Sequence, residues 1–109
     1  MRRGDVVIIA APGDFGKPRP AVVVQTDALP TQHASIIVCP LTSHITEAPD
    51  FRLTIEPTAS NGLQTPSQVM IDKPVTIRRQ RMGERIGRID TDDLARINIA
   101  LAFVLGIAD

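Results

Sequence analysis

The chain has 109 residues, enough for one domain with its own core, and its formal net charge is zero. Nonspecific coating of nucleic acid depends on releasing many counterions, so this charge argues against that mode and leaves only a local basic surface. Aromatic residues make up 3% of the chain, which indicates an aliphatic, β-type core. We therefore expect a single domain over residues 1–109, without an internal disulfide because Cys39 has no second cysteine to pair with.

The N-terminus offers no targeting signal. The apolar run that follows Arg3 is short and ends at Pro12 without a small-residue cleavage pattern, so we predict no signal peptide. No stretch approaches the length of a membrane span. We expect a cytoplasmic protein that does not bind a membrane.

The first third of the chain is rich in β-branched residues. Residues 5–10, 20–26 and 34–40 lack polar alternation, which is typical of strands buried on both faces. The loop over residues 11–19 contains Gly and Pro, so the first two strands are predicted to form a hairpin. Pro40 is expected to stop the third strand, with Thr42 just past its end.

The middle of the chain alternates short strands with turns. Residues 43–50 show no periodicity and are predicted to form a mobile surface loop. Residues 51–56 alternate apolar and polar, as a strand with one solvated face does, and Asn61-Gly62 is a strong turn signal. Further strands are predicted at residues 67–72, 75–79 and 85–89.

In the last predicted element, the spacing of apolar residues changes from that of a strand to that of a helix. From Leu94 onward, apolar residues recur every three to four positions, which predicts an amphipathic helix that ends at Gly106. Asp90 or Thr91 can cap its start. Many short strands followed by one helix predict a mainly β fold, a small curled barrel whose open side the helix covers.

Arg19 lies between Pro18 and Pro20, immediately before a buried strand. Each proline fixes its own φ and disfavours the helical region for the residue before it, so this arginine arrives on an extended, stiff segment. A guanidinium has several donors in a rigid fork and stays protonated, which suits it to gripping a phosphate. The alternative is a solvated arginine at a strand entrance.

Several short motifs together carry a family resemblance. Over nearly its full length the chain resembles the MazF/PemK-like toxins of bacterial toxin–antitoxin pairs. The order and spacing of the motifs carry the resemblance: Arg3-Gly4-Asp5-Val6-Val7, Lys17-Pro18-Arg19-Pro20-Ala21-Val22-Val23-Val24, Pro40-Leu41-Thr42-Ser43, Asn61-Gly62-Leu63 with Ser67 following, Asp72-Lys73-Pro74, and Ile86-Gly87-Arg88-Ile89.

The resemblance implies an SH3-like barrel of the CcdB/MazF type, a homodimer, and sequence-selective cleavage of single-stranded RNA without a metal or other cofactor. In that chemistry the 2′-hydroxyl attacks the neighbouring phosphorus and leaves a 2′,3′-cyclic phosphate and a 5′-hydroxyl. The implied protein partner is a cognate antitoxin, whose disordered acidic segment would fold over the same basic surface.

By position, the resemblance implies catalytic roles for three residues. Arg19 matches the arginine at the scissile phosphate, Thr42 matches a threonine that holds a phosphate oxygen, and Asp72 matches a possible proton acceptor. Thr42 could instead cap the following turn, and Asp72 could form a turn or pair with Lys73. The PemK branch has an arginine where this chain has Met70, and a histidine in the first hairpin loop that this chain lacks.

RNA contacts are predicted from Lys17, Ser43 and His44, with Phe15 as the one aromatic placed to stack on a base. The loops over residues 11–18 and 43–50 would gate RNA entry. His33 and His44 could perform acid–base chemistry, although loop histidines are usually solvated. A basic tract is expected to line an RNA groove, or else to form a solvated strand pair balanced by nearby aspartates; it comprises Lys73, Arg78, Arg79, Arg81, Arg85 and Arg88.

Two other functions fit the same fold. A CcdB-like poison of DNA gyrase inserts its C-terminal residues, but such proteins carry a tryptophan near the C-terminus and this chain has none. The chain could also be an inactive binding module that acts through its antitoxin. In that case neither Arg19 nor Thr42 would have a chemical duty, and their alanine variants would behave like wild type.

Overall fold

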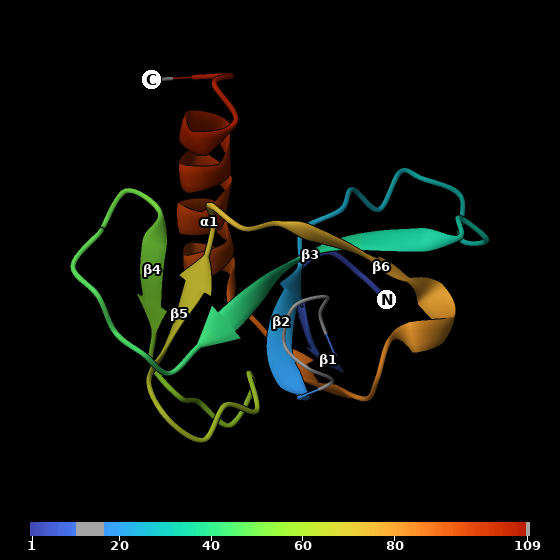
Figure 1. Ribbon diagram of the computed structural model, residues 1–109, viewed down its shortest axis with the longest axis horizontal. Helices are drawn as coiled ribbons and strands as arrows, with labels where there is room; N and C mark the ends of the chain where they lie inside the picture. The colour runs from blue at the N-terminus through green and yellow to red at the C-terminus, as the bar shows by residue number, and fades with distance from the viewer. Residues whose placement is uncertain (11–16, 109) are drawn as a thin grey trace.

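The computed structural model describes residues 1–10 and 17–108, and within them seven strands form one curled sheet beside a C-terminal helix (Figure 1). The strand order is β4-β5-β3-β2-β1-β7, and β6 pairs with β3 off this path. The elements are β1 (Asp5–Ile9), β2 (Arg19–Val23), β3 (Ser35–Thr42), β4 (Arg52–Ile55), β5 (Ser67–Met70), β6 (Val75–Arg78), the 3-10 turn η1 (Arg79–Arg81), β7 (Arg85–Arg88) and α1 (Thr91–Val104). The predicted mainly β fold with a C-terminal helix is confirmed.

Strand β3 joins the two halves of the sheet. One edge pairs with β2, and the other pairs with β6 up to Val38 and then with β5 from Leu41 onward. The prediction that Pro40 stops this strand is wrong, because β3 runs through Pro40 to Thr42. Pro40 lies where β3 changes partners on that second edge, so its missing N–H breaks no ladder bond there.

Both faces of the central strands are buried, as the unalternated sequence runs predicted. Alternate side chains of β1, β2 and β3 enter two different cores. The helix-side core contains Val6, Val22, Val24, Cys39, Leu41, Leu53, Ile55, Leu63, Val69, Ile71, Ile89, Ile97 and Ala100. The β6-side core contains Val7, Ile9, Ala21, Val23, Ile36, Val38 and Ile77.

Helix α1 packs against the helix-side core through Ile97 and Ala100. Its start is capped by Asp90, whose carboxylate accepts from the backbone N–H of Asp93, as the sequence predicted for Asp90 or Thr91. It ends just before Gly106, which has a φ of 73° and donates to the Phe103 carbonyl. Within the described residues, no helix combines the length and apolar character needed to cross a membrane.

Candidate active site

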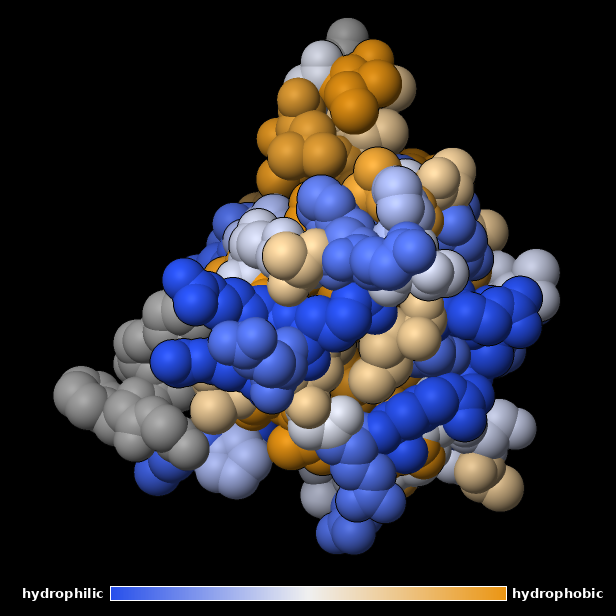
Figure 2. Space-filling model, turned by 90° about the vertical axis from the view of Figure 1, so that its right-hand side faces the viewer, coloured by the Kyte–Doolittle hydropathy of each residue, from blue (hydrophilic) through white to orange (hydrophobic). Residues whose placement is uncertain are grey.

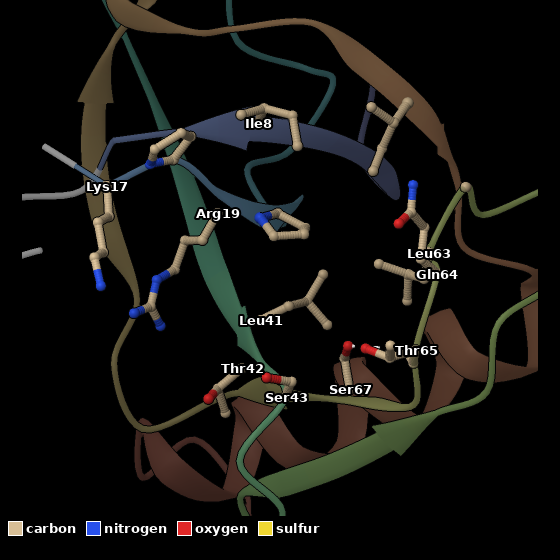
Figure 3. Close-up of a pocket in the computed structure, with 14 residues that line it drawn as sticks. Ile8, Lys17, Arg19, Leu41, Thr42, Ser43, Leu63, Gln64, Thr65 and Ser67 are labelled. Atoms are coloured by element: carbon tan, nitrogen blue, oxygen red, sulfur yellow. Dashed lines mark hydrogen bonds between the residues drawn. The ribbon is translucent and has the colours of Figure 1, made fainter.

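A pocket of about 490 Å³ opens where three distant parts of the chain meet (Figure 3). The segment entering β2, the end of β3 and the loop between β4 and β5 form most of its wall, and β1 and β7 add one side chain each. Its volume lies in the range of about 300–1,000 Å³ typical of ligand sites. The described residues that line it are Ile8, Lys17, Pro18, Arg19, Pro20, Leu41, Thr42, Ser43, Gly62, Leu63, Gln64, Thr65, Ser67 and Ile86.

One wall of the pocket is cationic. Arg19 is the first residue of β2, one residue earlier than the sequence suggested, and pairs across the hairpin with Ile9. Figure 3 shows the nitrogens of Lys17 and Arg19 gathered on the same side of the pocket. Lys17 and Arg19 are the two ionisable side chains among the described lining residues, and both are positively charged, which favours an anionic ligand.

Thr42 ends β3 at the pocket, with Ser43 directly after it. The Thr42 Oγ1 accepts a hydrogen bond of 3.1 Å from the backbone N–H of His44, so the turn-capping interaction considered from the sequence does form. This bond uses only a lone pair of the hydroxyl, which keeps its own proton for a second partner. Capping and phosphate binding are thus compatible in this side chain.

Gln68 fixes the loop that follows Thr42. Its side chain is 3% exposed and lies opposite Thr42 in the β3–β5 pairing. Its Oε1 accepts from the Thr46 N–H at 3.1 Å, and its Nε2 donates to the Thr46 carbonyl at 2.8 Å and to Thr54 Oγ1 at 3.2 Å. The loop over residues 43–50, which lacked periodicity, is therefore held at Thr46 by Gln68 of β5, and Gln68 in turn binds Thr54 of β4. Gln68 was not among the predicted site residues, although a glutamine within a predicted apolar strand was a signal.

The opposite wall is a loop built around Asn61. This residue is 3% exposed, and its Oδ1 accepts from the N–H groups of Thr58 and Leu63, each at 3.0 Å. Its Nδ2 donates to the Glu56 carbonyl at 2.9 Å. The predicted Asn61-Gly62 turn is present, and Gly62 has a positive φ of 72°. The turn signal was visible in the sequence, whereas the contribution of Leu63, Gln64 and Thr65 to a pocket was not.

Asp72 does not belong to this lining. It follows β5 and pairs with Arg52 of β4, with Arg52 Nε 3.0 Å from Asp72 Oδ1 and Nη2 3.4 Å from Oδ2. Burial by itself raises the pKa of Asp72, but the hydrogen bonds and charge of Arg52 outweigh it and lower the pKa below its ordinary value. A lower pKa makes a carboxylate a weaker base. The role of proton acceptor stays a prediction, and the structure shows an ion pair with Arg52 rather than with Lys73.

The other predicted RNA contacts are dispersed. His44 meets Thr42 through its backbone, and neither its ring nor Lys73 lines the pocket. Arg78 is exposed on β6, while Arg79 borders a different cavity and donates to the His33 carbonyl at 2.8 Å. Phe15 lies outside the described residues, as does most of the predicted gating loop over residues 11–18.

The basic tract is not one continuous track of unpaired cations. Arg85 and Arg88 of β7 both contact the buried carboxylate of Asp5, each at 3.1 Å. The part of the surface that carries β6 and η1 is mainly hydrophilic (Figure 2), but its arginines lie apart from the pocket. Neither the predicted RNA groove nor the predicted solvated strand pair fully describes the basic tract, because Arg85 and Arg88 form ion pairs with the buried Asp5 of β1.

Comparison with known proteins points to one family. Residues 2–105 match the family described as PemK-like, MazF-like toxin of type II toxin–antitoxin system. The chain is 45% identical over 109 residues to a probable endoribonuclease MazF of Mycolicibacterium smegmatis, covering 99% of each. It is 29% identical over 116 residues to the endoribonuclease MazF9 of Mycobacterium tuberculosis, covering 98% of each.

Solved structures show the same fold. An endoribonuclease in complex with its cognate antitoxin, from a mycobacterial species, superposes with a TM-score of 0.84 at 23% identity, covering 100% of this chain and 98% of that chain. The MazF of a Deinococcus radiodurans MazE–MazF crystal has a TM-score of 0.76 at 26% identity, covering 97% and 96%. The curled sheet with one terminal helix is therefore the architecture of MazF toxin structures.

Proposed function

Because this chain belongs to the PemK-like, MazF-like toxin family of type II toxin–antitoxin systems, we propose that it is a toxin that cleaves single-stranded RNA at specific sequences. Cleavage needs no metal and leaves a 2′,3′-cyclic phosphate and a 5′-hydroxyl. The observation that carries this proposal is the meeting of Lys17, Arg19, Thr42 and Ser43 in one pocket. Two cations and two hydroxyls at a single concave site can bind the negatively charged oxygens of a phosphodiester.

Arg19 is the residue proposed to stabilise the reaction. When the 2′-hydroxyl attacks phosphorus, the nonbridging oxygens gain negative charge, and a guanidinium fixed in advance lowers the energy of that state. Pro18 and Pro20 restrict the backbone on both sides of Arg19, so little reorganisation accompanies the reaction. Lys17 adds a second positive charge on the same wall.

Thr42 is proposed to position the phosphate. Its Oγ1 is oriented by the N–H of His44, and its remaining proton can be donated to a nonbridging oxygen. Ser43 supplies a second hydroxyl at the same edge of the pocket. The clamp that Gln68 places on Thr46 holds the segment carrying both hydroxyls against the sheet.

Two protein partners complete the proposal. The relative structures include an endoribonuclease bound to its cognate antitoxin, which supports an antitoxin with an acidic segment that binds the cationic wall. The second half of α1 and the residues after it expose Ile99, Phe103, Leu105 and Ile107, and this end of the molecule forms the apolar apex seen in Figure 2. An apolar group of this kind is typical of an assembly surface, which supports a homodimer. Sedimentation velocity of the free chain tests that assembly.

The test of the activity is incubation of the purified chain with mixed-sequence RNA in EDTA, followed by mapping of the fragment ends. The Arg19→Ala variant is compared with Arg81→Ala, which removes an equal charge from an exposed position outside the pocket. We expect cyclic-phosphate and 5′-hydroxyl ends at one recurring sequence, and a loss of about 10²–10³-fold in rate for Arg19→Ala alone.

Each other outcome contradicts a definite part of the proposal. Intact RNA with the wild-type chain would contradict the nuclease activity and favour the gyrase-poison or binding-module alternative. Cleavage that requires an added divalent cation would contradict metal independence. Equal rates for the wild type and Arg19→Ala would retain the activity and remove Arg19 from the chemistry.

A further inference from the structure

We propose that Gln64 determines part of the RNA sequence preference, by hydrogen-bonding the base of a nucleotide next to the scissile phosphate. This inference rests on the proposed function, and it concerns the half of the pocket that the proposed chemistry does not use. The pocket extends from the cationic wall to the loop over residues 62–65, well beyond the reach of a single phosphate group.

The two sides of the pocket carry different chemical groups. In Figure 3 the nitrogens of Lys17 and Arg19 lie on one side, Leu41 lies between, and the amide of Gln64 lies on the opposite side. The pocket lining also includes apolar groups, contributed by Ile8, Pro20, Leu41, Leu63 and Ile86. With its phosphate at the cations, a nucleotide would lay its base across these apolar groups and turn the base edge toward Gln64.

Gln64 carries the only amide side chain among the described residues that line the pocket, and an amide is suited to reading a base. It is exposed, and none of the hydrogen bonds found among the described residues uses its amide. Ser67 is buried instead, and its hydroxyl donates to the Thr65 carbonyl at 3.0 Å. An amide offers one donor and one acceptor side by side, and that pattern can pair with a base edge.

The loop holds Gln64 in a defined place. Asn61 fixes the backbone of Leu63 through its Oδ1, and Gly62 lies against the backbone of β7, where a Cβ would overlap the Ile86 carbonyl oxygen. Leu63 is itself buried in the helix-side core, one residue before Gln64. A reading group on a rigid segment favours one ligand geometry over others, which is what selectivity requires.

The experiment is cleavage of a randomised single-stranded RNA pool, with sequencing of the cut ends, by the wild type, Gln64→Leu and Gln64→Glu. Gln80→Leu is the matched control, because Gln80 is exposed on η1 outside the pocket. We expect Gln64→Leu to keep cutting but to lose base preference at one position beside the cut. The loss should be at least about fivefold, since a two-bond amide–base pair contributes about 5- to 150-fold discrimination. Gln64→Glu replaces the donor by an acceptor, so its preferred base should change.

The outcomes separate this inference from the proposed function. A wild type that cuts no RNA would defeat the proposed function, and this inference with it. If the wild type cuts selectively and Gln64→Leu shows an unchanged preference at every position, Gln64 does not read a base while the nuclease activity stands. If folded Gln64→Leu loses cleavage at all sequences equally, the residue serves the reaction generally and the selectivity role is overturned. A thermal melt of each variant establishes that it is folded.

Discussion

Thr42 and Asp72 show how hydrogen-bond partners decide what a residue can do. The Thr42 hydroxyl accepts from one backbone N–H and keeps its proton, so the cap orients the group without consuming it. Asp72 has both carboxylate oxygens turned to Arg52, which stabilises its ionised form and weakens it as a base. Both residues came from the same family resemblance, and only Thr42 lies in the pocket.

The role of Thr42 gives a prediction at the scale of the residue. Replacing Thr42 by Val removes the proton donor, so we expect cleavage to slow by about 10- to 100-fold, because hydrogen bonds to charged groups contribute about 1.5–3 kcal/mol. Thr42→Ser keeps the hydroxyl and should stay within about fivefold of wild type. Initial rates on a short RNA with one cleavage site measure both variants. A Thr42→Val variant as fast as wild type would exclude the hydroxyl from the reaction.

The elements of the fold position the pocket through a few buried polar side chains. Gln68 connects β5 to the loop after β3, and Asn61 organises the connection between β4 and β5. Both are nearly inaccessible, and their amides hydrogen-bond backbone groups of the two loops. Without these two side chains, the loop after β3 and the β4–β5 loop would lack those contacts.

The contact between the β4–β5 loop and β7 is tested by comparing two glycines. Gly62 and Gly106 have nearly the same φ, 72° and 73°, but a Cβ at Gly62 would overlap the Ile86 carbonyl while one at Gly106 meets nothing within 4 Å. We expect Gly106→Ala to lower the free energy of unfolding by about 1 kcal/mol, the cost of the left-handed backbone alone. Gly62→Ala should lower it by about 3 kcal/mol or more. Urea unfolding measures both, and equal losses would show that the close approach does not matter.

At the scale of the whole molecule, ion pairs join the first strand of the chain to the last, because β1 and β7 are neighbours in the sheet and Asp5 lies opposite Arg88 in their pairing. Asp5 of β1 is 4% exposed and accepts from Arg85 and Arg88 of β7 and from the backbone N–H of Arg2. Burial by itself raises the pKa of Asp5, but the Arg2 N–H and the two guanidinium groups outweigh it and lower the pKa. The charged carboxylate therefore stabilises the pairing of β1 with β7.

These ion pairs predict a pH dependence of stability. Because the folded-state pKa of Asp5 lies below its ordinary value of 3.8, the stabilisation is fully present above about pH 4 and is lost as the pH falls through the folded-state value. Asp5→Asn should lower the free energy of unfolding by about 2 kcal/mol at pH 7. Urea unfolding of the wild type and the variant at pH 7 and near pH 3 measures the difference. It should shrink at the lower pH, and a constant difference would contradict the role of the charge.

The order and type of the elements followed from local patterns in the sequence. Runs of β-branched residues, the Asn61-Gly62 turn and the Asp90 cap act within a few residues of chain, so they were predictable. Arg19 and Thr42 became candidates through the family resemblance, and both line the pocket. Strand bounds shifted by a few residues, and Pro40 was misjudged because its tolerance depends on the partner strand opposite it.

Only the tertiary structure decided which candidates share a site. The pocket joins segments near residues 17–20, 41–43 and 62–67, and their meeting depends on β3 changing partners between β6 and β5. Asp72 has the right chemistry in sequence, as do Arg85 and Arg88 of the basic tract, but strand pairing brings Asp72 to Arg52 and both arginines to Asp5. Gln64 carries no local signal of function, because the role of a polar side chain is set by what the fold places around it.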